Sequence, residues 1–212
     1  MPEGIKDWRR LFAEGRNSDP ARKDVPVSQE PVLESRTKTE GHRVEKIPLE
    51  PTVLSPVQLT NTKFLDNPSK RRLVAGDFKR LILDKARPVV LQDSLTLERF
   101  DLSKGDKDRN IVADVPEEAF FADETELYAR VAQLISLEES GYSGILATGS
   151  SMNVFYLKGK KTVVMVHTAI SNATRQRVWV SDADSFDAPG HRPETRVFLK
   201  NIESKAPIPD ET

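Results

Sequence analysis

The stretch DETELYARVAQLISLEESG, residues 123–141, carries the clearest secondary-structure signal in the chain. Asp123 is followed three positions later by Glu126, an arrangement that resembles a capping box with Asp in the place of Ser or Thr. Apolar residues then recur at helical spacing from Leu127 to Ile135, and Gly141 supplies a stop signal. The stretch therefore predicts a helix that begins after Asp123 and ends near Gly141.

Beyond Gly141 the apolar period changes to two, which is typical of strands. Short strands are predicted downstream at residues 145–148, 152–158, 162–168, 175–180 and 195–200. Upstream, a second helix is predicted at 77–86, and further strands at 89–91, 95–100 and 111–113. Because most of these strands follow one another directly, we predict an α+β fold: a small antiparallel sheet with two helices on one face.

The first third of the chain differs from this domain in composition. Between residues 13 and 70 it holds seven of the fourteen prolines and one aromatic residue, Phe64. Such a segment buries too little apolar surface to offset the entropy of ordering it. We therefore predict four parts: an amphipathic helix at 1–15, an extended or disordered Pro-rich arm at 16–72, a globular α+β domain at 73–204 and a frayed acidic tail at 205–212.

Spaced apolar residues in the first two parts indicate docking on a protein partner. The predicted partner-binding residues are Ile5, Trp8, Leu11 and Phe12 on one face of the helix, and Leu49, Leu54, Leu59 and Phe64 along the arm. The alternatives are that the arm is a plain linker, that the helix packs on its own domain, or that it lies on a membrane surface.

Composition excludes several classes of function. The chain has 212 residues, a formal net charge of −1 and no cysteine, so disulfides, thiol nucleophiles and Cys-ligated zinc are excluded. A near-neutral charge argues against binding DNA mainly by bulk charge. No apolar run is long enough to span a membrane, and the first residues lack a signal-peptide pattern. We expect an intracellular, cytoplasmic chain, or one in a particle assembled there, without a cofactor.

Candidate chemistry is sparse. His167 ends a predicted strand, and Asp182, Asp184, Asp187 and His191 follow it, but their spacing matches no metal signature. We therefore predict no metal site and no catalytic residue, and retain a metal-dependent hydrolase built on His167, Asp182 and Asp184 only as a third hypothesis. The glycines at 141–149 match no phosphate-binding loop and no nucleophile elbow.

Basic residues supply a second hypothesis. Lys158, Lys160 and Lys161 form the tip of a predicted hairpin, and Arg175, Arg177 and Trp179 alternate along one strand. Such a face could stack bases and hold phosphates. The first hypothesis nevertheless remains a non-catalytic structural or adaptor subunit of a larger protein assembly, which docks on its neighbours through the amino-terminal helix and arm. A nucleic-acid-binding accessory protein is the alternative.

Overall fold

The computed structural model describes residues 44–171, 174–186 and 194–202. The predicted helix with Ile5, Trp8, Leu11 and Phe12, the first part of the arm, and the tail lie outside these residues, as do Asp187 and His191. The elements are β1 (Lys46–Leu54), β2 (Val57–Leu59), η1 (Pro68–Lys70), β3 (Arg72–Val74), α2 (Gly76–Phe78), η2 (Lys79–Leu83), β4 (Val89–Leu91), β5 (Leu95–Leu102), α3 (Asp108–Ile111), η3 (Glu117–Ala119), α4 (Glu124–Glu139), β6 (Met152–Tyr156), β7 (Thr162–Ile170), β8 (Arg177–Ser185) and β9 (Arg196–Lys200).

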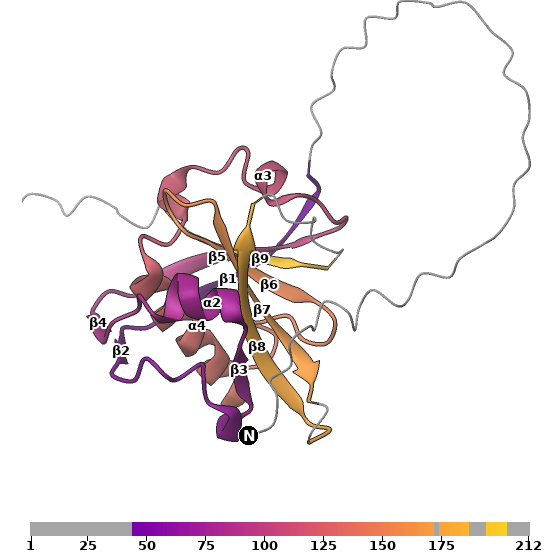
Figure 1. Cartoon of the computed structure of the whole chain (residues 1–212). Coiled ribbons are helices and arrows are strands. Elements are labelled where there is room, and N and C mark those ends of the chain that lie inside the picture. Colours follow the sequence, from indigo (N-terminus) through magenta and orange to yellow (C-terminus); the bar gives the residue numbers. More distant parts are fainter. Residues whose placement is uncertain (1–43, 172–173, 187–193, 203–212) are drawn as a thin grey trace, which may run out of the picture. The chain divides into compact units, whose positions relative to one another are not determined.

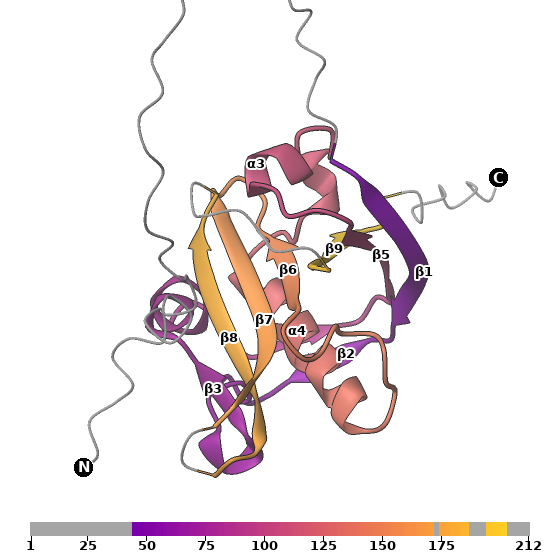
Figure 2. The same ribbon diagram turned by 90° about the vertical axis from the view of Figure 1, so that its right-hand side faces the viewer.

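A seven-stranded mixed sheet forms the centre of the described fold, so the prediction of a small antiparallel sheet is wrong. The strand order is β1-β5-β9-β6-β7-β8-β3, with β1 and β3 at opposite margins (Figures 1 and 2). The last strand, β9, lies between β5 and β6 and runs parallel to β6. At the margin, β3 runs parallel to β8. Strands β2 and β4 form a separate two-stranded sheet.

Core residues cover both faces of the sheet, which corrects the prediction of two helices on one face. On one face, α2, η2 and α4 pack on a cluster that includes Phe155, Val164 and Phe198 (Figure 1). On the other face, the segment with α3 and η3 covers Val154 and other strand residues. Adjacent residues of one strand point to opposite faces, so strands buried on both sides need apolar residues at successive positions.

The folded part begins well before residue 73, the predicted domain boundary. Strands β1 and β2 and the first residue of β3 come from the segment predicted as an arm, and β1 pairs antiparallel with β5 through most of its length. Leu54 and Leu59 are buried in the core of their own chain, whereas Phe64 is half-buried against it and Leu49 is half-buried on β1. Residues 44–72 therefore form part of the globular unit.

Helix α4 begins where the sequence predicts. The Asp123 carboxylate accepts hydrogen bonds from the backbone N–H groups of Thr125 and Glu126 at 2.8 and 2.9 Å. The Glu126 carboxylate in turn accepts from the Ala122 N–H at 2.6 Å. These bonds satisfy N–H groups that lack partners inside the helix. No helix among the described residues is both long and apolar enough to cross a membrane.

Candidate functional site

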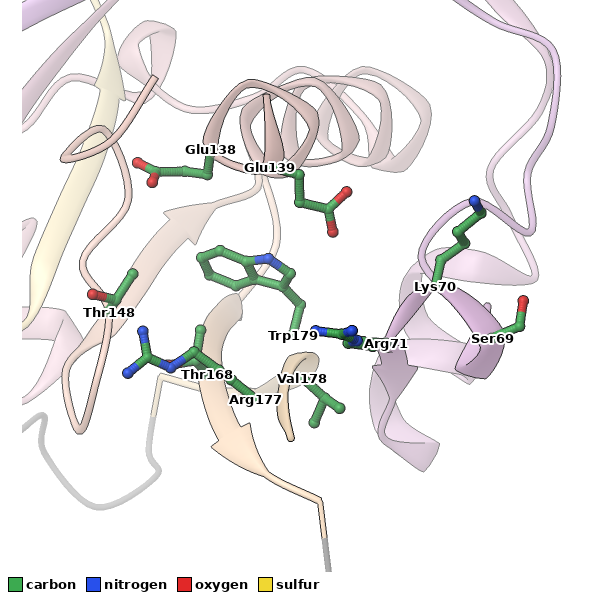
Figure 3. Close-up of a pocket in the computed structure, with 10 residues that line it drawn as sticks. All are labelled: Ser69, Lys70, Arg71, Glu138, Glu139, Thr148, Thr168, Arg177, Val178 and Trp179. Atoms are coloured by element: carbon green, nitrogen blue, oxygen red, sulfur yellow. The ribbon is translucent and has the colours of Figure 1, made fainter. Parts of the chain in front are cut away.

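A pocket of about 510 Å³ opens beside the margin of the sheet formed by β8 and β3. Figure 3 shows the Trp179 indole at its centre, with two carboxylates from the end of α4 on one side. The lining residues come from η1, β7, β8, the end of α4 and the loop before β6: Ser69, Lys70, Arg71, Glu138, Glu139, Thr148, Thr168, Arg177, Val178 and Trp179.

The η1 turn fixes the backbone of Arg71 at the pocket margin. Asn67 caps η1 by accepting a hydrogen bond from the Lys70 N–H, and Arg71 follows in the left-handed region with φ of 58°. The Arg71 N–H donates to the Pro68 carbonyl at 3.0 Å, and the Trp179 N–H donates to the Arg71 carbonyl at 2.8 Å. A non-glycine residue adopts this conformation only where its surroundings enforce it. Arg71 and Trp179 are therefore held in register by the backbone.

An ion pair behind the pocket fixes the position of Glu139. The Arg72 guanidinium donates to both oxygens of the Glu139 carboxylate, with 3.1 Å from Nε to Oε1. The same guanidinium lies 3.7 Å from the centre of the Phe64 ring. Arg72 is buried, and two parallel hydrogen bonds make this the strong form of an arginine–carboxylate pair. Arg72 thus neutralises one of the two carboxylates in the pocket lining.

The loop between α4 and β6 forms the wall that carries Thr148. Asn153, which is fully buried on β6, donates to the carbonyls of Ala147 and Val166, both at 2.9 Å, and accepts from the Ala147 N–H. The Thr168 hydroxyl accepts from the Gly149 N–H at 3.0 Å. A Glu138 oxygen accepts from the Leu146 N–H at 2.6 Å. These bonds tie the loop to the sheet and to α4.

Two arginines from neighbouring strands hold the start of the same loop. Arg99 on β5 and Arg196 on β9 both donate to the carbonyls of Gly144 and Ile145, at 2.8 to 3.2 Å. Arg196 also pairs with Asp101 through both carboxylate oxygens. Burial, and then the nearby Arg196 charge, lower the pKa of Arg99. These contacts position the loop and do not line the pocket.

In the pocket, most hydrogen-bond acceptors already bind protein donors, whereas several donors have no acceptor in the part of the chain that the structure describes. Among the described residues, the side chains of Lys70, Arg71 and Arg177 make no hydrogen bond or ion pair, and the Trp179 indole N–H has no acceptor. The acceptors are largely engaged, because Glu138, Glu139 and Thr168 already bind protein donors. The pocket therefore offers hydrogen-bond donors and positive charge to a ligand.

The structure separates the basic residues that the sequence grouped as one nucleic-acid-binding face. Arg177 and Trp179 line the pocket at the start of β8, and Arg175 lies in the turn before it with φ of 56°. The Lys158–Lys161 tip lies at the opposite end of β7, roughly 27 Å away along the strand.

At that tip, Lys158 pairs with Glu118 at 3.3 Å, and Lys160 pairs with Glu124. Lys161 is exposed. The two predicted basic groups therefore do not form a continuous surface, and only Arg177 and Trp179 of the predicted set belong to the pocket.

The residues of the hydrolase hypothesis lie on one face of β7 and β8. Register places His167 opposite Val180 and Asp182 opposite Met165, so these two side chains occupy diagonal positions, and Asp184 lies two residues further along, opposite Val163. Burial lowers the pKa of His167, which favours its neutral form. Within the described ranges, no group of three or more His, Asp or Glu side chains is arranged to hold a metal ion.

Sequence reasoning missed most of the pocket. Trp179 and Arg177 were found from strand alternation, but the acidic wall of Glu138 and Glu139 was assigned only to a helix end. The run Lys70-Arg71-Arg72 is the one signal that could have indicated a binding site, because three consecutive basic residues stand out in a near-neutral chain. Thr148 and Thr168 carry no such signal.

Comparisons with protein-family models, with curated proteins and with solved structures each find no match to this chain. The assignment of function therefore depends on the geometry and chemistry of the pocket.

Proposed function

We propose that this chain is a non-catalytic adaptor subunit of a larger protein assembly, and that its folded unit binds a partner at the Trp179 pocket. One observation carries the proposal: the pocket presents a half-buried indole beside three cations that are unpaired among the described residues. Tryptophan and arginine are the residues that contribute most binding energy at protein interfaces. Backbone hydrogen bonds fix the positions of Arg71 and Trp179 before a partner arrives, which reduces the entropy lost on binding.

The amino-terminal segment supplies a second docking element in this proposal. Ile5, Trp8, Leu11 and Phe12 have the spacing of a helix that binds in a groove. The described residues from 44 onward supply all strands of the main sheet and the two core clusters. Residues 1–43 can therefore serve a partner without being needed for the sheet. Leu54 and Leu59 are not part of the proposed docking surface, because they are buried in the core of their own chain.

A nucleic-acid-binding accessory protein is the second candidate, and one observation favours it. Arg177 and Trp179 lie together in an accessible pocket, where an indole can stack on a base and a guanidinium can bind a phosphate. Lys158 and Lys160 do not extend this surface, since they lie at the far end of β7 and pair with carboxylates. The support is therefore confined to one pocket.

Migration of the protein in extracts of its source cells tests the proposal. We expect the tagged full chain to migrate in a complex larger than its 23.8 kDa monomer. Arg177→Glu, Trp179→Ala and deletion of residues 1–43 should each reduce that complex. Tyr142→Ala is the matched control, because Tyr142 is an aromatic residue that is 65% exposed and does not line the pocket.

A full chain that migrates as a monomer would contradict the adaptor function. Loss of the complex on nuclease treatment would favour the nucleic-acid alternative. Circular dichroism of each variant checks that it is folded. Arg177 is exposed, so the Arg177→Glu substitution should leave the core intact.

A further inference from the structure

We propose that the Trp179 pocket recognises an acidic polypeptide segment in which an apolar side chain has carboxylates on both sides. The inference rests on the proposed adaptor function and names the chemistry of the partner. The ligand would place its apolar side chain against the Trp179 indole and its carboxylates against Arg177 on one side and Arg71 and Lys70 on the other.

The charge of the lining favours an anionic ligand. Lys70, Arg71 and Arg177 are cationic, and Glu138 and Glu139 are the two carboxylates. Because Arg72 neutralises Glu139 from behind, three cations face one remaining carboxylate. An acidic ligand therefore gains attraction from the site, whereas a basic ligand meets net repulsion.

The placement of the cations favours an extended ligand over a compact anion. Figure 3 shows Arg177 on one side of the Trp179 indole and Arg71 on the other, with Lys70 further out on the turn. A single phosphate group would be expected to collect its cations around one point. Cations on both sides of an aromatic surface instead match a chain whose acidic side chains flank an apolar one.

Hydrogen bonding gives the same preference. The Trp179 indole N–H and the three cationic side chains offer donors without acceptors among the described residues, while Glu138, Glu139 and Thr168 already accept from protein donors. A peptide supplies carboxylate and backbone carbonyl acceptors along its whole length. Such a segment could satisfy the donors of the pocket without displacing its internal hydrogen bonds.

The pocket margin is fixed before a ligand binds. The left-handed backbone of Arg71 is held by Pro68 and by the Trp179 N–H, and the Thr148 wall is held by Asn153 and Thr168. Association then orders mainly the cationic side chains and the ligand. This preorganisation makes a short acidic segment a sufficient ligand for a measurable interaction.

Tryptophan fluorescence of the full chain provides the test. The chain has two tryptophans, so Trp8→Phe leaves Trp179 as the only indole reporter. The probe is a short synthetic peptide with a central leucine between two runs of glutamate. The matched control peptide replaces every glutamate with glutamine, and a short oligothymidylate tests the nucleic-acid alternative.

We expect the glutamate peptide to shift the Trp179 emission and to bind more weakly as salt increases. Arg177→Glu and Lys70→Glu should each weaken binding about tenfold, because a repulsion replaces an attraction. Both residues are exposed, so the variants should fold. Lys104→Glu should leave binding unchanged, because Lys104 is an exposed lysine outside the pocket.

Equal binding of the glutamine peptide, or binding of the oligothymidylate alone, would overturn the inference. Different results would contradict the adaptor function and the acidic-ligand assignment. If the assembly depends on Trp179 but the glutamate peptide does not bind, the ligand class is wrong and the adaptor function stands. If the peptide binds while Trp179→Ala leaves the assembly intact, the adaptor role of the pocket is wrong and the acidic-ligand assignment stands.

Discussion

Glu124 joins the start of α4 to the segment after η2 and to the β6–β7 turn, at the opposite end of α4 from the pocket. The residue is 7% exposed, and its carboxylate pairs with Lys85, at 3.1 Å, and with Lys160 on the β6–β7 turn. Burial raises the pKa of Glu124, but hydrogen bonds from Lys160, from a backbone amide and from Lys85 outweigh that effect, and the net shift is downward from 4.5. The carboxylate is therefore more stable ionised in the folded chain than in the unfolded chain.

This shift predicts a stability contribution that depends on pH. A group whose pKa is lower in the folded state stabilises the fold at pH values above its unfolded-state pKa. This stabilisation is lost as the pH falls through the folded-state pKa. We expect Glu124→Gln to lower the free energy of unfolding by about 1 kcal/mol near pH 7, since the paired lysines are half-exposed and screened by water.

Urea denaturation across acidic pH measures the effect. The difference between Glu124→Gln and the unaltered chain should shrink as the pH falls below 4.5. Glu117→Gln is the control, because Glu117 is exposed and has no ion pair among the described residues. An equal loss for both variants, or a loss for Glu124→Gln that does not change with pH, would contradict the assigned role.

At the scale of elements, α4 was predictable because its signals are local. A cap, a helical period and a terminal glycine all lie within residues 123–141, and the structure has the helix at Glu124–Glu139. Residues 145–148 show the limit of such reasoning. Their apolar pattern predicted a strand, but they form the loop that Asn153, Arg99 and Arg196 bind from the sheet. These long-range hydrogen bonds leave no local signal.

Strand β1 was missed because of its prolines. Pro48 and Pro51 lack the N–H that pairs a strand on both sides, so the sequence indicated an extended arm. Proline is tolerated on an edge strand, and β1 is one margin of the sheet, with a register shift between Leu49 and Thr52. The position of β9 between β5 and β6 was also not predictable, because it depends on contacts between residues about a hundred positions apart.

The N-cap of α4 gives a prediction for a single element. Replacing Asp123 with Ala removes the acceptor for the Thr125 and Glu126 N–H groups. We expect the free energy of unfolding to fall by about 1 kcal/mol, as is usual for the loss of a helix N-cap. Asp123→Asn keeps a side-chain oxygen and should retain most of the stability. Urea titration of both variants checks this, and an Ala variant as stable as the unaltered chain would show that the cap does not stabilise α4.

For the molecule as a whole, the pocket could not be predicted because five separate segments build it. Glu139 and Trp179 are 40 positions apart, and Arg71 joins them only because β3 is added in parallel to the margin of the sheet. The parallel register pairs Arg72 with Trp179. Because residues 70–72 lie in the predicted arm, no local signal places Arg71 near the indole. The candidate site thus depends on β3, which, like β1 and β2, is absent from the strands that the sequence predicts.

That boundary yields a prediction about truncation. A chain that begins at residue 44 retains every strand of the main sheet, whereas a chain that begins at residue 73 loses β1 and β2 and the first residue of β3. The longer deletion also removes Leu54, Leu59 and Leu65, which are all buried. Burial of each leucine stabilises a fold by about 1.5–3 kcal/mol, and whole domains are stable by only about 5–15 kcal/mol.

We therefore expect the chain of residues 44–212 to unfold cooperatively with nearly the free energy of the full chain, and the chain of residues 73–212 to lack a cooperative transition. Denaturation followed by circular dichroism measures both. The sequence predicts one arm at residues 16–72, and the two deletions end at residues 43 and 72. Comparing them therefore separates the segment proposed to dock on a partner from the residues that form the sheet. A cooperatively folded 73–212 chain would show that β1 and β2 are dispensable for the fold and that residues 44–72 are not part of the globular unit.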